Sequence, residues 1–139
     1  MISDKMQKAL NEQINAELFS SYLYLSMSAY FESENWFGFA KWMQVQSQEE
    51  YSHAMKFFKY LNDVDGKVLL DGIEKPKSKW KSPLEVYEES HKHELYITER
   101  INSLAGLALQ EKDYSTSLFL NYFIAEQVEE VSTAAQIVH

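Results

Sequence analysis

Long segments of mixed apolar and polar residues, almost free of helix breakers, make up most of the chain. Only four Gly and two Pro occur in 139 residues, and most of them (Gly66, Gly72, Pro76 and Pro83) lie in one short stretch. Polar residues interrupt every apolar run, so no 18 apolar residues follow one another as a membrane span would require. The pattern therefore predicts long helices on both sides of one irregular segment.

Start signals divide these segments into four helices. Ser3 can cap the first helix. Ser82 can cap the third, with Pro83 at the first helical position and Glu85 completing a capping box. Asp113 can cap the fourth, and the second begins near Trp36. The predicted helices cover about residues 4–31, 36–63, 83–111 and 114–139.

The segment 64–82 is too long for a tight turn in a compact helical domain. A helix of about 28 residues is roughly 42 Å long, and about 18 extended residues span up to roughly 60 Å. The segment can therefore run the full length of a bundle and make the second and third helices parallel. The short links 32–35 and 112–113 favour antiparallel hairpins. Residues 1–139 are thus predicted to form a single all-α domain, a four-helix bundle in which one long crossover joins the second helix to the third. The apolar patch 67–70 within this crossover is expected to pack against the bundle.

Polar residues near the middle of the predicted helices repeat at one spacing. They are Glu17 in the first helix, Glu50 and His53 in the second, Glu94 in the third, and Gln127 and Glu130 in the fourth. In each hairpin the second helix places its two polar residues 33 and 36 positions after the Glu of the first helix. A single Glu-x-x-His pair is typical of exposed helix surfaces, but the same spacing in both hairpins indicates a shared site at mid-height.

Metal binding explains this set of residues best. Ionised carboxylates inside an apolar bundle cost several kcal/mol each unless cations or partners neutralise them. Mixed carboxylate and imidazole ligands suit redox-active iron, and one Glu per helix with Glu-x-x-His is a known di-iron arrangement. We expect Glu50 to bridge two irons, with Glu17 and His53 on one of them. Glu94 and Glu130 would hold the other, and Gln127 would be a weak or outer ligand. Without metal, a helical interaction bundle would leave the buried carboxylates unexplained.

Four sequence motifs carry a resemblance to a known family. They are Asn11-Glu12-Gln13-Ile14-Asn15-Ala16-Glu17, Ser20-Ser21-Tyr22-Leu23-Tyr24-Leu25, Gln48-Glu49-Glu50-Tyr51-Ser52-His53-Ala54 and Ala125-Glu126-Gln127-Val128-Glu129-Glu130. Over nearly its whole length the chain resembles the bacterial non-haem ferritins, which have a ferritin-like four-helix bundle. The resemblance implies an iron-storage protein and ferroxidase. Such a protein oxidises Fe(II) with O2 or H2O2 and stores ferric oxyhydroxide inside a hollow homo-oligomer, a 24-mer.

The resemblance also implies roles for residues outside the repeated set. A third iron site, typical of the bacterial branch, maps onto Glu49, Glu126 and Glu129. Tyr24 matches a tyrosine close to the di-iron centre, where it would donate an electron or a hydrogen bond. Two features depart from the family pattern. Val131 stands where another acidic residue is usual, and family members continue beyond the position of His139 into a short fifth helix that lines a shell pore.

Composition narrows the alternatives. A net charge of −8 argues against nucleic acid as a partner, and the absence of Cys excludes disulfides, thiolate zinc sites, iron–sulfur clusters and cysteine nucleophiles. The N-terminal residues do not resemble a signal peptide, so we expect a soluble cytoplasmic protein without membrane attachment.

Other di-iron proteins fit the sequence less well. A bacterioferritin would place a haem-binding Met at Ser52, and a Glu and a His at Gln127 and Glu130, so we expect no haem. Rubrerythrin-type peroxidases carry four Cys that this chain lacks. The alternative is a bacterioferritin-like protein, or another di-iron oxidase or peroxidase that stores no mineral.

Overall fold

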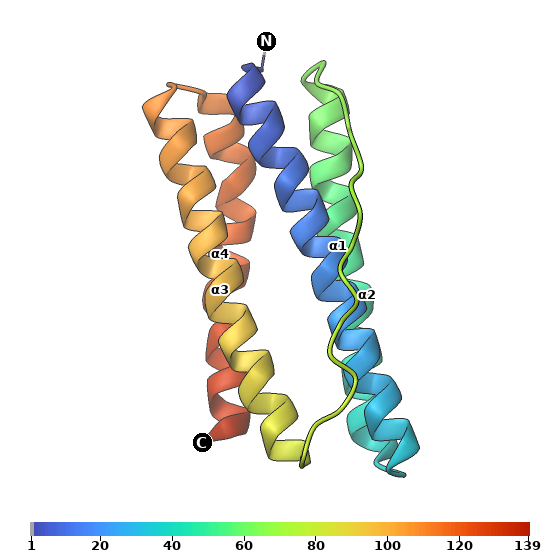
Figure 1. Ribbon diagram of the computed structural model, residues 1–139. Helices are drawn as coiled ribbons and strands as arrows, with labels where there is room; N and C mark the ends of the chain where they lie inside the picture. The colour runs from blue at the N-terminus through green and yellow to red at the C-terminus, as the bar shows by residue number, and fades with distance from the viewer. Residues whose placement is uncertain (1) are drawn as a thin grey trace. The chain divides into compact units, whose positions relative to one another are not determined.

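The computed structural model describes residues 2–139, which form four long helices (Figure 1). They are α1 (Asp4–Ser33), α2 (Phe37–Asp63), α3 (Pro83–Gln110) and α4 (Tyr114–Val138). Within residues 2–139 no residue lies in a strand, and none of the four helices is long and apolar enough to cross a membrane. The predicted bounds are confirmed to within two residues at every helix end.

Side chains cap three of the four helix starts, as predicted. The backbone N–H groups of Met6, Glu85 and Thr116 donate to the side chains of Ser3, Ser82 and Asp113 at 3.0, 3.2 and 3.0 Å. These bonds satisfy amide groups that have no partner within the helix. Helix α2 is the exception, because its cap residue Trp36 makes no side-chain hydrogen bond to the helix start.

Helices α1, α2 and α3 end in the same left-handed turn, which the sequence analysis did not predict. Asn35, Asp65 and Lys112 adopt positive φ angles of 63°, 65° and 57°. In each case the next residue donates its backbone N–H back to a carbonyl five positions earlier, at 2.8 Å. This is a Schellman motif, in which Gly is usual and Asn is the common substitute. It turns the chain sharply, so α2 and α4 begin almost directly after α1 and α3.

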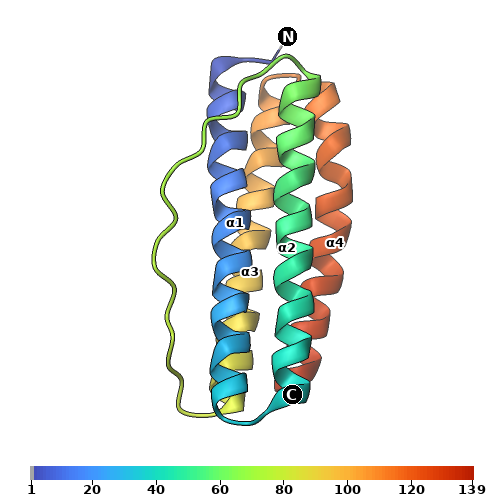
Figure 2. The ribbon, with the colours of Figure 1, turned by 90° about the vertical axis from the view of Figure 1, so that its right-hand side faces the viewer.

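The helices form two compact units, residues 2–81 and 82–139. In the first unit α1 packs antiparallel against α2, and in the second α3 packs antiparallel against α4 (Figures 1 and 2). Large apolar side chains are fully buried in each. In the first unit these include Met6, Leu10, Met27, Phe31, Met43, Phe57 and Leu61, and in the second Ile97, Ile101 and Leu120.

Hydrogen bonds from α1 hold the start of the crossover that follows α2. The Nδ2 of Asn11 donates to the carbonyl of Lys67 at 2.9 Å, and the backbone N–H of Leu69 donates to the Oδ1 of Asn11 at 2.8 Å. The backbone N–H of Lys67 also donates to the Oε1 of Gln7 at 3.0 Å. Two side chains of α1 therefore replace the backbone partners that an extended segment would find in a sheet.

The far end of the crossover contacts the other end of α1. The Oγ of Ser26 donates to the carbonyl of Lys77 at 2.6 Å, and the rings of Trp80 and Tyr30 meet edge to face with centroids 5.5 Å apart. The segment thus returns along the length of the α1–α2 hairpin, as Figure 2 shows. This confirms the predicted long crossover.

One expectation about the crossover is wrong. Leu69 and Leu70 were expected to pack against the bundle, but their exposed fractions are 57% and 68%. The reason is that Asn11 binds the backbone of Lys67 and Leu69, so the main chain rather than the side chains faces α1. These leucines give the first unit an exposed apolar strip.

Asn11 therefore makes a testable contribution to stability. Replacing Asn11 with Ala leaves the backbone groups of Lys67 and Leu69 without their protein partner, which should lower the free energy of unfolding by about 1–3 kcal/mol. Guanidinium unfolding of the parent and the variant measures the difference. Asn102→Ala, at an exposed position in α3, controls for the higher helix propensity of Ala. Equal unfolding curves for the parent and Asn11→Ala would show that the crossover is not held in this way.

Candidate metal centre

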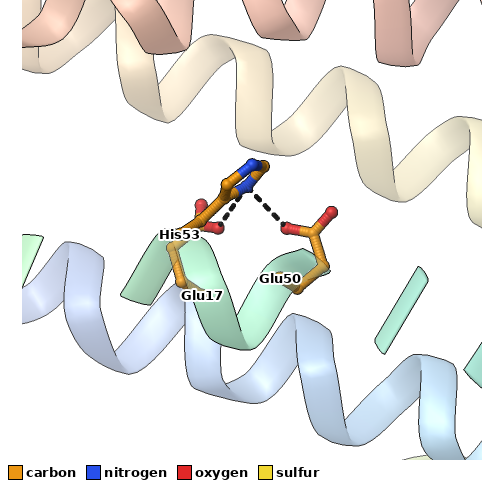
Figure 3. A group of neighbouring side chains, drawn as sticks. All are labelled: Glu17, Glu50 and His53. Atoms are coloured by element: carbon orange, nitrogen blue, oxygen red, sulfur yellow. Dashed lines mark ion pairs between the residues drawn. The ribbon is translucent and has the colours of Figure 1, made fainter. Parts of the chain in front are cut away.

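Three of the predicted ligands meet on one face of the α1–α2 hairpin (Figure 3). Glu17 comes from α1, and Glu50 and His53 come from α2. Their exposed fractions are only 1%, 1% and 4%. The Nδ1 of His53 lies 3.4 Å from the Oε2 of Glu17 and 3.4 Å from the Oε2 of Glu50. Two carboxylates and one imidazole therefore converge on one point that is shielded from water.

Small serine residues set the register of α1 against α2 next to this site. The Oγ of Ser21 donates to the carbonyl of Ser47 at 2.8 Å, and the Oγ of Ser47 donates to the carbonyl of Ser21 at 2.7 Å. A third bond joins the Oγ of Ser28 to the carbonyl of Ala40 at 2.7 Å. Ser21 follows Glu17 by one helical turn, so these bonds between the helices also fix the height of Glu17 relative to α2.

The spacing of the three side chains fits a shared metal ion. A distance of 3.4 Å is too long for a strong charged hydrogen bond, which would measure about 2.7–2.9 Å. Two ligand atoms that each lie about 2.1 Å from one ion are about 3.0–3.4 Å apart. Within residues 2–139, no group donates a hydrogen bond to the buried Oε2 of Glu17. A buried anionic oxygen without a donor is what a cation would satisfy.

The pKa values of His53 and Glu50 are both raised in this cluster. Burial by itself would lower the pKa of His53, but the attraction of the two nearby carboxylates, Glu17 and Glu50, for the charged ring outweighs it and raises that pKa to about 11. Burial raises the pKa of Glu50 to about 7, with a further increase from the charge of Glu17 and an opposing effect of His53. In the metal-free protein the imidazole is therefore charged near pH 7, and a metal must displace its proton to bind the ring nitrogen.

Two buried glutamines that the sequence analysis missed hold the carboxylates. The Nε2 of Gln13 donates to the Oε1 of Glu17 at 2.9 Å, and the Nε2 of Gln46 donates to the Oε1 of Glu50 at 3.2 Å. Each Gln lies one helical turn before its Glu, and the two glutamines are themselves 33 positions apart. The same spacing that drew attention to Glu17 and Glu50 could have revealed them.

The α3–α4 hairpin places its own predicted residues together. The Nε2 of Gln127 lies 3.2 Å from the Oε2 and 3.2 Å from the carbonyl oxygen of Glu94, and 3.1 Å from the Oγ1 of Thr98, as a donor to all three. Glu94 and Gln127 are buried, and Glu130 is half-buried close to one turn beyond Gln127 on α4. Gln127 thus donates a hydrogen bond to Glu94, one of the predicted ligands.

The remaining predicted residues differ in exposure. Tyr24 is fully buried in α1, two turns beyond Glu17. Of the three residues mapped to a third iron, Glu126 is half-buried, whereas Glu49 and Glu129 are exposed. They lie next to the buried ligands in sequence but about 100° away around their helices, so they face more water.

Comparison with known proteins identifies the class to which this fold and site belong. Residues 7–139 match the family model described as a ferritin-like domain. A bacterial non-heme ferritin of Bacteroides fragilis is 48% identical over 138 residues, which cover 99% of this chain and 87% of that protein. One of Staphylococcus epidermidis is 42% identical over 133 residues, covering 96% and 80%. The chain belongs to the ferritin-like family, and its curated relatives include bacterial non-heme ferritins.

Solved structures agree with this assignment. An open-pore ferritin of the archaeon Archaeoglobus fulgidus has a TM-score of 0.98 and 51% identity, with 99% of this chain and 85% of that chain covered. A ferritin of Chlorobium tepidum has a TM-score of 0.97 and 39% identity, with 100% and 85% covered. These similarities confirm the predicted fold class, an all-α ferritin-like four-helix bundle.

The raised pKa of Glu50 predicts how pH affects the metal-free protein. Because its pKa is higher in the folded state than the ordinary value of 4.5, the folded state holds the proton more tightly. This contribution to stability is present below pH 4.5 and is lost as the pH rises towards 7. Glu50→Gln has no carboxyl group at this position, so its stability should not show this decrease as the pH rises. Between pH 5 and 7 the free energy of unfolding of the parent should fall by roughly 2 kcal/mol relative to Glu50→Gln.

Chelator-treated proteins should be unfolded with guanidinium at several pH values. Glu12→Gln, a substitution at an exposed position of α1, is the matched control and should follow the parent curve. Parallel curves for the parent and Glu50→Gln over this range would contradict the burial of an ionisable Glu50.

Proposed function

We propose that this protein stores iron and acts as a ferroxidase, oxidising Fe(II) to Fe(III) with O2 or H2O2. The cluster of Glu17, Glu50 and His53 carries the proposal, because it offers two carboxylates and an imidazole to one cation in a buried place. Membership of the ferritin-like family and the named bacterial non-heme ferritins among its relatives support the same function. The cytoplasm is the compartment that we propose for this activity.

We assign a second iron to the α3–α4 hairpin. Glu94 and Glu130 would be its ligands, and Glu50 would be shared with the iron at Glu17 and His53. The support is the repeated spacing of 33 and 36 positions in the two hairpins, together with the burial of Glu94 and Gln127. Glu17, Glu50, His53, Glu94 and Glu130 would hold two Fe(II) ions close together, and each ion could then supply one electron to the same oxidant.

The protein groups favour the oxidised metal by electrostatics. Carboxylate oxygens are hard anionic ligands, and their attraction for a cation grows as the iron charge rises from +2 to +3. His53 would give up its proton when Fe(II) enters, so the net charge of the cluster would rise by one unit rather than two. Tyr24, buried on the same helix as Glu17, would supply an electron or a hydrogen bond near the centre.

A third iron and a shell complete the proposal. Glu49, Glu126 and Glu129 would bind the additional iron, in keeping with their position beside the buried ligands in sequence. Self-association into a hollow 24-mer would enclose the ferric mineral. Large apolar side chains exposed on the first unit, such as Phe37, Leu69 and Leu70, support association between subunits. The chain is a single ferritin-like domain in this proposal.

Replacing Glu50 tests the shared ligand. Glu50→Ala should abolish rapid Fe(II) oxidation more completely than Glu17→Ala, since a shared carboxylate serves both irons and Glu17 serves one. Stopped-flow absorbance at two irons per subunit measures the initial rate under air. Glu12→Ala on the exposed face of α1 should keep the parent rate. A Glu50→Ala protein that oxidises iron as fast as the parent would eliminate the di-iron centre.

Replacing Glu129 tests the separation of the third iron from the first two. Glu129→Ala should leave the initial fast phase intact but change the ratio of iron oxidised to oxygen consumed, and slow later turnovers. Oxygen-electrode measurements alongside stopped-flow absorbance follow both quantities. Glu99→Ala, exposed on α3, provides a control for the loss of one surface charge. Loss of the fast phase in Glu129→Ala would show that the two groups of carboxylates act as one site.

A further inference from the structure

Two glutamine side chains are buried beside the Glu17–Glu50–His53 cluster. The exposed fraction of Gln13 is 0% and that of Gln46 is 7%. A primary amide loses its hydrogen bonds to water when it is buried, so a buried Gln needs protein partners. Both side chains give an amide N–H to a carboxylate on their own helix, Gln13 to Glu17 at 2.9 Å and Gln46 to Glu50 at 3.2 Å.

The two amides divide the carboxylate oxygens into two kinds. In Glu17 and in Glu50 the Oε1 accepts the glutamine N–H, whereas the Oε2 faces His53. Both Oε2 atoms lie 3.4 Å from the same atom, the Nδ1 of His53. Each amide therefore holds its carboxylate by the Oε1 atom and leaves the Oε2 atom directed at the Nδ1 of His53.

This arrangement is restricted to the α1–α2 hairpin. The positions one turn before Glu94 and Gln127 in the other hairpin are occupied by Ser90 and Phe123, which cannot donate an amide N–H from the side chain. The glutamine pair is thus not a general consequence of burying a glutamate in a long helix. It occurs where a carboxylate from each of two helices approaches a single imidazole.

We propose that Gln13 and Gln46 are positioning residues that orient Glu17 and Glu50 for the first metal ion. This inference rests on the proposed function, because it assumes that the cluster binds a metal. A free glutamate side chain samples several rotamers, and a hydrogen bond to one oxygen removes part of that freedom before the ion arrives. Hydrogen bonds to ligands commonly change metal affinity by about 10–100-fold.

A neutral donor suits this task better than a charged one. Lys or Arg at either position could also hold the carboxylate, but its positive charge would oppose the entry of a divalent cation. The glutamine amide fixes the direction of the carboxylate and leaves its charge unchanged. The cluster therefore keeps two anionic ligands for the incoming ion.

Binding of Co(II), followed by calorimetry and by visible absorption, tests the proposal without iron oxidation. Gln13→Met and Gln46→Met keep the length of an unbranched side chain but remove the N–H donor. Each should weaken binding of the first Co(II) about tenfold and change its absorption spectrum. Gln44→Met, at an exposed position of α2, should bind as the parent does.

A double-substitution cycle separates positioning from a general structural effect. If Gln13 acts through Glu17, Gln13→Met should have no further effect on Co(II) affinity in a Glu17→Ala background, but should keep its effect in a Glu50→Ala background. An equal loss in both backgrounds would mean a structural role and would overturn the proposal. Should a Met variant fail to fold, Gln13→Asn and Gln46→Asn keep a buried amide that is one methylene shorter, and the same weakening is expected.

The outcomes for the parent and the Gln variants are distinguishable. Parent protein that does not bind Co(II) in the cluster would contradict the proposed function and this inference together. Parent protein that binds Co(II) while both Gln→Met variants bind it equally tightly would overturn the positioning role alone.

Discussion

The burial of two carboxylates against one imidazole is the constraint on which the α1–α2 hairpin depends. Glu17 and Glu50 lose almost all contact with water, and such a loss costs several kcal/mol for each unpaired charge. His53 offsets part of this cost as a charged partner, with its pKa raised to about 11. The offset is incomplete, since one oxygen of Glu17 has no hydrogen-bond donor within residues 2–139. A site that is left short of positive charge favours the binding of a cation.

The rest of the hairpin keeps these groups in place. Hydrogen bonds between Ser21 and Ser47 fix the heights of α1 and α2 relative to each other, and the crossover lies along α1 through Asn11 and Ser26. Gln13 and Gln46 then fix the direction of the carboxylates. Each of these contacts is a hydrogen bond from a polar side chain, so the position of the cluster depends on directed bonds as well as on apolar packing.

Much of this structure could be predicted from the sequence, because the signals involved are local. Helix starts follow from Ser3, Ser82 and Asp113, whose side chains need only their own first turn. The meeting of Glu17 with Glu50 and His53 follows from a spacing that two antiparallel helices convert into proximity.

Other features depend on contacts between distant segments and were missed. The exposure of Leu69 and Leu70 follows from hydrogen bonds of the crossover backbone to Asn11, which hydrophobicity does not reveal. The left-handed turn at Lys112 runs against the preference of its side chain and is set by the chain reversal between α3 and α4. Gln13 and Gln46 look like ordinary helix residues until their burial is known, because Gln is common on exposed helix faces.

Crystals grown without oxygen and soaked in Fe(II) test the central claim most directly, by anomalous diffraction at the iron absorption edge. The account predicts a strong iron peak within about 2.3 Å of the Nδ1 of His53 and of the Oε2 atoms of Glu17 and Glu50. A map with iron only at exposed carboxylates such as Glu49 and Glu129, and none beside His53, would contradict it.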